Sequence, residues 1–158
     1  MINLCDIVNV QRTKCHAPSS TKKSALELIS QLLAEQCPEL TDIDILTKLI
    51  ERERLGSTNI GHGVAIPHAR MPGLSSSIAS FIRLETPISF DGASDTAVDL
   101  VFGFIVPDHF TQEHVALIAL LATRFNEQSL RDQLRTATTD IELYRALMTE
   151  PEATFIHA

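Results

Sequence analysis

The sequence has no tryptophan and only one tyrosine among its 158 residues, and its large side chains are seven phenylalanines. This scarcity of aromatic rings predicts a core built mainly from aliphatic side chains. The chain also has no apolar run near the roughly 18 residues that a membrane-spanning helix needs. The first residues show no basic flank before an apolar stretch, so we expect no secretory signal.

Basic residues are fewer than acidic ones: the chain has 13 Lys and Arg and 20 Asp and Glu, which gives a formal net charge of −7. This balance disfavours nucleic acid as a partner, because a phosphate backbone selects for clustered cations. Anionic membrane surfaces are disfavoured for the same reason. The three cysteines, Cys5, Cys15 and Cys37, are odd in number and lack the paired spacing of a metal site. We therefore expect reduced thiols in a cytoplasmic protein with no direct membrane insertion.

The length fits one domain, which we expect to cover residues 1–158. Helical periodicity predicts two helices in the first third of the chain. The first is expected to open with the capping pair Ser24 and Glu27. The second is expected to face inward through Ile43 and to end at Gly56 in a left-handed conformation.

The middle of the chain changes character, because residues 57–63 are rich in Gly, Ser, Thr and Asn and predict an irregular loop. Apolar stretches at 78–84 and 98–106 predict strands, the second buried on both faces. Thr111 is expected to cap a third helix with Val115 facing inward, and two more helical segments follow. This order predicts a single α/β domain in which a mixed β-sheet is flanked by α-helices on both faces.

The most informative side chain is His68, which directly follows Pro67 in a glycine-rich segment. Proline fixes its own backbone angle, lacks an N–H group and biases the preceding residue towards extended geometry. His68 is therefore presented in a defined direction. A neutral imidazole is a good nucleophile near neutral pH, since its ordinary pKa is about 6.5. Attack on phosphorus gives a phosphohistidine that can pass the group on, so we predict that His68 accepts a phosphoryl group.

Phosphoryl transfer also requires in-line positioning and hydrogen-bond donors for the phosphoryl oxygens. Arg52 is a candidate clamp, because a guanidinium group offers paired donors to phosphate. His114 falls in the first turn of the predicted third helix, where the helix N-terminus favours anions. Whether His114 lies beside His68 depends on the fold. The loop before His68 offers further donors: Ser57, Thr58 and Asn59.

Each of these residues also has a simpler explanation. A histidine in a loop is usually a solvated side chain, and Arg52 lies in a Glu-Arg-Glu-Arg run where local ion pairs are typical. We expect His62, between two glycines, to be exposed. A zinc site made of His62, His68 and His114 is conceivable, although no cysteine pair or His-Glu-x-x-His motif supports it. A binding module that never carries phosphate is a further alternative.

Residues 52–68 resemble the active-site signature of the enzyme IIA domains of the bacterial phosphotransferase system, in the mannitol/fructose class. The core Gly-x-Gly-x-Ala-Ile-Pro-His is specific, and the likeness extends over about residues 4–148. Two positions depart from the family pattern. His62 stands where Asn or Asp is commoner, and Ala69 stands where Gly is usual.

Within this class the chain is most similar to the nitrogen-regulatory proteins. The resemblance implies that His68 is phosphorylated on its tele nitrogen, that Arg52 and His114 are its partners in the site, and that no cofactor or metal is needed. It implies a histidine phosphocarrier protein as the donor, and regulatory targets such as potassium transport or sensor kinase systems. Sugar-specific members instead pass the group to a IIB domain. We prefer the regulatory function, because no IIB or transmembrane IIC domain is fused to these 158 residues.

Overall fold

The computed structural model describes residues 3–90 and 97–149, so the outermost residues of the predicted domain lie outside the described part. Two short 3-10 helices, η1 (Leu4–Asp6) and η2 (Val10–Arg12), precede the first strand. The strands are β1 (Thr13–Ala17), β2 (Asn59–Gly61), β3 (Val64–Ala65), β4 (His68–Met71), β5 (Ile78–Ile88) and β6 (Val98–Pro107). The helices are α1 (Lys22–Glu35), α2 (Asp42–Leu55), α3 (Thr111–Phe125), α4 (Gln128–Thr136) and α5 (Asp140–Met148).

The six strands form one mixed sheet in the order β1-β5-β6-β3-β2, with β4 also paired to β6. The central pair β5 and β6 is antiparallel, whereas β1 runs parallel to β5. Along its other edge β6 pairs in parallel first with β3, opposite Leu100 and Val101, and then with β4, from Phe104 to Pro107. The predicted mixed sheet is confirmed. The segment around His68 is positioned by its pairing with β6.

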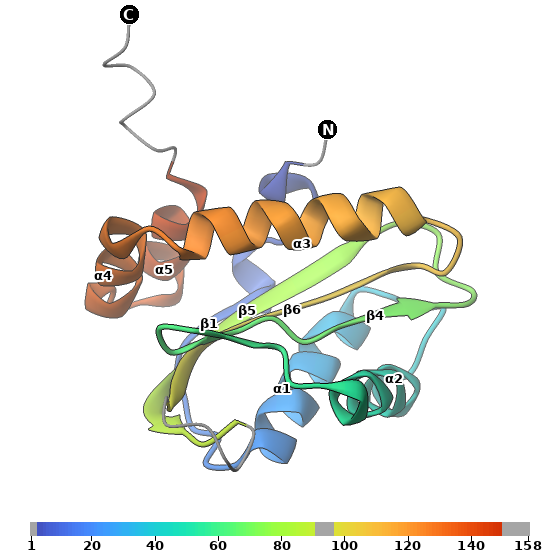
Figure 1. Ribbon diagram of the computed structural model, residues 1–158, viewed down its shortest axis with the longest axis horizontal. Coiled ribbons are helices and arrows are strands. Elements are labelled where there is room, and N and C mark those ends of the chain that lie inside the picture. The colour runs from blue at the N-terminus through green and yellow to red at the C-terminus, as the bar shows by residue number, and fades with distance from the viewer. Residues whose placement is uncertain (1–2, 91–96, 150–158) are drawn as a thin grey trace, which may run out of the picture.

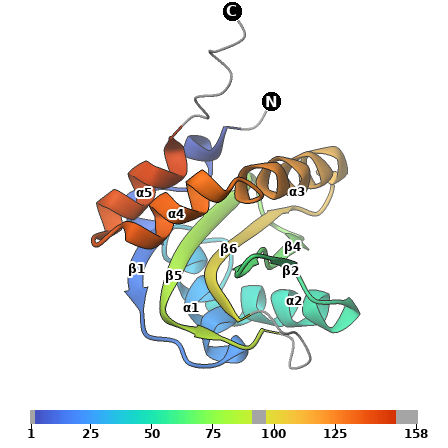
Figure 2. The same ribbon diagram turned by 60° about the vertical axis from the view of Figure 1, so that its left-hand side comes forward.

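Helices cover both faces of this sheet, as predicted. Figures 1 and 2 show α3, α4 and α5 on one face and α1 and α2 on the other. Strand β6 is buried continuously from Leu100 to Pro107, and its side chains alternate between two apolar clusters. Phe102 and Phe104 join the cluster beneath α3, while Val101 and Ile105 join the cluster beneath α1 and α2. Continuous burial is expected for a strand with helices on both sides.

Two predicted helix caps are wrong. Helix α1 begins one turn earlier than expected, because Thr21 is its N-cap and exchanges hydrogen bonds with Ser24, the third helical residue. Helix α3 begins at Thr111 itself, its N-cap is Phe110, and no side chain caps it. His114 nevertheless falls in the first turn of α3, as predicted.

Two predicted inward positions and one predicted turn are also wrong. Ile43 is 70% exposed and Val115 is 61% exposed, whereas Ile45 and Leu117 are fully buried. The apolar stripe of each helix is rotated, because the fully buried side chains and not the first apolar residue define the face that packs on the sheet. Gly56 has φ 161°, an extended conformation that any residue adopts, so it is not the expected left-handed cap.

The predicted loop before His68 contains a short hairpin of β2 and β3. Gly63 in this hairpin has φ +79°, and a Cβ atom there would lie 2.5 Å from Nη2 of Arg135. Arg135, in α4, forms an ion pair with Asp99 at 2.8 Å and donates a hydrogen bond to the carbonyl of His62 at 2.6 Å. The glycine therefore allows α4 to hold the hairpin tip closely.

Candidate active site around His68

His68 is the first residue of β4, directly opposite Phe104 of β6. Its side chain is only 6% exposed, and its ring stacks on the Phe104 ring with centroids 5.3 Å apart and planes 12° apart. The carbonyl of Pro67 accepts a hydrogen bond from the Phe104 N–H at 3.1 Å. The strand pairing and the stacking together fix the direction of the imidazole, which the sequence predicted from Pro67 alone.

The two ring nitrogens of His68 differ in their surroundings. Nδ1 lies 2.7 Å from the backbone carbonyl oxygen of Ile66. A carbonyl oxygen can only accept, so this contact requires the proton on Nδ1 and leaves Nε2 with a free lone pair. Burial lowers the pKa of His68, as does the charge of Arg52, while the Ile66 contact and Glu53 act in the opposite direction. The ring is therefore neutral near neutral pH, with Nε2 as its nucleophilic atom.

The structure brings His114 next to His68, which the sequence could not show. The two ring centroids are 5.0 Å apart, and the planes meet at 69°. Burial, followed by the charges of His68, Arg70 and Arg52, lowers the pKa of His114 from 6.5 to about 4. Nδ1 of His114 is buried and has no hydrogen-bond partner among the described residues. A neutral imidazole thus stands against the edge of the His68 ring.

A surface cleft of about 520 Å³ opens over these residues. It lies between the end of α2, the strand β4 and the start of α3. Arg52, in the last turn of α2, reaches it half-buried, and its Nη1 donates a hydrogen bond to the carbonyl of Gly56 at 2.8 Å. The residues that line the cleft are Lys48, Glu51, Arg52, Leu55, His68, Ala69, Arg70, Thr111, His114 and Val115.

The cleft contains two cations that sequence reasoning missed, Arg70 and Lys48. His68 and Arg70 are alternate residues of β4, and alternate residues of a strand lie on the same face of the sheet. Recognising residues 68–71 as a strand would therefore have placed Arg70 beside the predicted acceptor. With Arg52, these residues give the cleft three cations against the single carboxylate of Glu51, although the whole chain is acidic.

Apolar side chains form part of the rim of the cleft. Leu55 is 85% exposed and Val115 is 61% exposed, and both line the opening above His68. Exposed apolar groups around a cleft are typical of a surface that a protein partner covers.

The loop residues Ser57, Thr58 and Asn59 do not line the cleft. The Ser57 hydroxyl accepts from the Asn59 N–H at 3.1 Å, and the Asn59 side chain accepts from the Gly61 N–H at 2.9 Å. Thr58 is buried, and its hydroxyl donates to the carboxylate of Glu53. Their predicted role as direct phosphate ligands therefore stays a prediction, whereas the contacts in the structure are with the protein itself.

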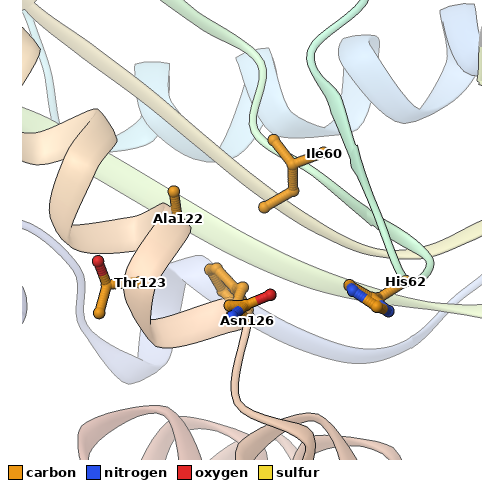
Figure 3. Close-up of a pocket in the computed structure, with 6 residues that line it drawn as sticks. Ile60, His62, Ala122, Thr123 and Asn126 are labelled. Atoms are coloured by element: carbon orange, nitrogen blue, oxygen red, sulfur yellow. The ribbon is translucent and has the colours of Figure 1, made fainter.

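His62 lies away from the cleft. It is exposed, with φ +59°, at the tip of the hairpin between β2 and β3. Figure 3 shows it in a separate groove with Ile60 and the C-terminal end of α3. A zinc site would require His62 to lie beside His68 and His114. His62 instead lines a different groove. Among residues 3–90 and 97–149, no group of three potential ligands is arranged to hold a metal ion.

A comparison with known protein families identifies the family of the chain. A model of the family described as "Phosphoenolpyruvate-dependent sugar phosphotransferase system, EIIA 2" matches residues 6–149. The chain belongs to this family. The resemblance that residues 52–68 indicated is thereby confirmed, and the protein is a component of the phosphotransferase system.

Relatives with the name "Nitrogen regulatory protein" match nearly the whole chain. The protein from Pseudomonas aeruginosa is 38% identical over 148 residues, which cover 94% of this chain and 96% of that protein. The protein from Escherichia coli K12 is 36% identical over 154 residues, which cover 97% of this chain and 93% of that protein. The predicted similarity to the nitrogen-regulatory proteins within the family is therefore confirmed.

Solved structures share the fold. The crystal structure of nitrogen regulatory protein IIA-Ntr from Neisseria meningitidis has a TM-score of 0.85 and 34% identity, and the match covers 92% of this chain and 99% of that chain. The crystal structure of IIA mannitol from Escherichia coli has a TM-score of 0.75 at 19% identity, covering 89% of this chain and 98% of that chain. The second likeness concerns the fold alone. Within the described residues, no helix is long and apolar enough to cross a membrane.

The low pKa of His114, about 4, predicts a pH-dependent stability. Between this value and 6.5 the unfolded chain binds more protons at this position than the folded chain. The free energy of unfolding should therefore fall as the pH decreases through this range. We expect a smaller fall in His114→Asn than in the unmodified protein, measured by urea unfolding at a series of pH values. An unchanged pH dependence in the variant would contradict this explanation.

Proposed function

We propose that this protein is a phosphoryl carrier that accepts its phosphoryl group on Nε2 of His68. The observation that carries the proposal is the 2.7 Å contact between Nδ1 of His68 and the carbonyl oxygen of Ile66. This contact leaves Nε2 as the nucleophile, in a residue that lines a cleft with Arg52 and Arg70. A buried, neutral and oriented imidazole beside two guanidinium groups suits attack on phosphorus.

In the proposed step, Nε2 of His68 attacks the phosphorus of a phosphohistidine on the donor protein. The donor's N–P bond breaks as the new N–P bond forms, so the phosphoryl group passes from one imidazole to the other. Each ring keeps its own N–H proton, and positive charge moves from the donor ring to the His68 ring. The carbonyl of Ile66, which accepts the Nδ1 hydrogen bond, stabilises that charge. The step needs no cofactor.

The phosphoryl oxygens carry most of the negative charge during such a transfer, so donors around them lower the barrier. Arg52 and Arg70 approach the cleft from α2 and β4, and a guanidinium group matches phosphate oxygens with paired donors. Lys48 adds a third positive charge at the edge. His114, held neutral by its low pKa, would contribute an N–H hydrogen bond without repelling the positive charge that develops on His68.

The proposed donor is a histidine phosphocarrier protein, and the exposed Leu55 and Val115 offer it an apolar contact beside His68. We propose that this exchange takes place in the cytoplasm. Relatives in the family are named nitrogen regulatory proteins. We therefore propose that the phosphorylation state of His68 controls binding to regulatory targets, such as potassium transport or sensor kinase systems.

The alternative is a sugar-specific IIA component with the same chemistry and a separate IIB partner. A protein of this kind would discharge quickly to a mannitol- or fructose-type IIB domain. We expect the phosphorylated protein to keep its label when such a IIB domain is added in equimolar amount. Loss of the label within the mixing time would instead favour the sugar branch.

The acceptor can be tested with phosphoenolpyruvate, enzyme I and the histidine phosphocarrier protein. We expect an acid-labile phosphoryl adduct on the unmodified protein and none on His68→Ala. Arg52→Ala and Arg70→Ala should slow the uptake on the order of 100-fold, because each removes donors from the phosphoryl oxygens. His114→Ala should also slow it. The rates are measured by rapid-quench labelling.

Arg54→Ala is the matched control for Arg52→Ala. Arg54 lies in the same last turn of α2 but lines a different surface pocket, with Lys22 and Lys23. Its variant should take up the label at the rate of the unmodified protein. Equal uptake by His68→Ala would disprove the proposal, and equal rates in the Arg52 and Arg70 variants would remove both residues from the mechanism.

A further inference from the structure

The carboxylate of Glu53 is buried next to the active site, and the transfer step does not use it. Glu53 follows Arg52 in the last turn of α2, and its side chain is only 5% exposed. Lys22 of α1 forms an ion pair with it at 2.9 Å. Removing a carboxylate from water is costly unless it is paired and hydrogen-bonded, so the contacts that satisfy Glu53 indicate what it holds in place.

Both oxygens of Glu53 are bound to one residue of the loop before His68. Oε1 accepts from the backbone N–H of Thr58 at 3.2 Å, and Oε2 accepts from the Thr58 hydroxyl. The carboxylate therefore accepts two hydrogen bonds from Thr58. These bonds connect the end of α2, which carries Arg52, to the hairpin that leads to His68.

Thr58 in turn holds the residue that contacts the imidazole. Its carbonyl oxygen accepts a hydrogen bond from the Ile66 N–H at 2.9 Å. The carbonyl of Ile66 then accepts from Nδ1 of His68 at 2.7 Å. Ile66 lies between β3 and β4, and the next residue, Pro67, has no N–H to anchor the chain. The bond to Thr58 is thus the contact that supports the Ile66 peptide on the hairpin side.

We propose that Glu53 is a positioning residue for His68. It clamps Thr58, Thr58 holds the Ile66 peptide, and the Ile66 carbonyl keeps the proton of His68 on Nδ1. The clamp also fixes the end of α2, and with it Arg52, relative to the imidazole. Its effect on transfer rests on the proposed function, whereas its effect on the proton of His68 does not.

The test is the tautomer of His68 in the unphosphorylated protein, read from the ¹⁵N chemical shifts of the labelled ring. The unmodified protein should carry the proton on Nδ1. Thr58→Val removes the hydroxyl at similar volume, and Thr58→Ser retains it. Glu53→Ala removes both carboxylate oxygens, and with them both hydrogen bonds to Thr58. We expect a mixture of tautomers in Thr58→Val and Glu53→Ala, and the Nδ1–H form alone in Thr58→Ser.

The rate of phosphoryl uptake gives the second measurement. Misplacement of a reacting group by about 1 Å costs on the order of 100-fold. We therefore expect roughly 10- to 100-fold slower uptake in Thr58→Val and Glu53→Ala, and the unmodified rate in Thr58→Ser. Rescue by serine separates the hydroxyl contact from the bulk of the side chain.

The chain offers a matched control at its other end. Glu142 of α5, which is exposed, also binds a threonine at two points: its Oε1 accepts from the N–H and from the hydroxyl of Thr138, both at 2.8 Å. Glu142→Ala and Thr138→Val remove hydrogen bonds of this threonine far along the chain from His68. They should lower the melting temperature while leaving the tautomer and the uptake rate unchanged.

The outcomes separate the two proposals. If the unmodified protein takes up the label, and folded Thr58→Val and Glu53→Ala keep the Nδ1–H form and the full rate, the positioning role is wrong. If the unmodified protein takes up no label but the tautomer shifts in both variants, the positioning role stands and the proposed function fails. A tautomer shift in the Glu142 and Thr138 variants as well would also overturn the positioning role, because the effect would then follow from stability alone.

Discussion

One hydrogen bond organises the site: Nδ1 of His68 donates to the carbonyl of Ile66 at 2.7 Å. It fixes the tautomer, and so decides which ring nitrogen is available to an incoming group. Strand β4 sets the backbone of His68 against β6, and stacking on Phe104 sets the plane of the ring. The central strand β6 positions both the ring and the backbone of His68, because it carries Phe104 and the residues that pair with β3 and β4.

The electrostatics of the cleft differ from those of the whole chain. The formal net charge is −7, yet Lys48, Arg52 and Arg70 surround the opening and Glu51 is the only carboxylate among the lining residues. Burial lowers the pKa of both His68 and His114, and the charge of Arg52 adds to this effect at both rings, with Arg70 contributing at His114. In the proposed function, the same arrangement keeps the nucleophile neutral and binds the negative charge of the phosphoryl group.

Much of this structure could be predicted from the sequence, and the gaps have physical causes. Strand β6 is apolar almost throughout, so its burial can be predicted from the sequence. The position of His68 directly after Pro67 predicts an oriented imidazole. Strand β4 was missed because four residues are too few to show a period, and Arg70 was missed with it. The contact of Thr58 with Glu53 could not be predicted, because it depends on how α2 meets the hairpin. The position of His114 beside His68 could not be predicted, because it depends on how α3 packs against the sheet next to β4 and β6.

The most direct test of this account is the nitrogen that carries phosphorus. The protein is labelled with ¹⁵N in its histidine rings, phosphorylated through the histidine phosphocarrier protein, and studied by ¹⁵N–³¹P correlation under alkaline conditions. The free lone pair opposite the Ile66 contact predicts one coupled nitrogen, Nε2 of His68. Phosphorus on Nδ1 of His68, or on any other residue, would contradict the account.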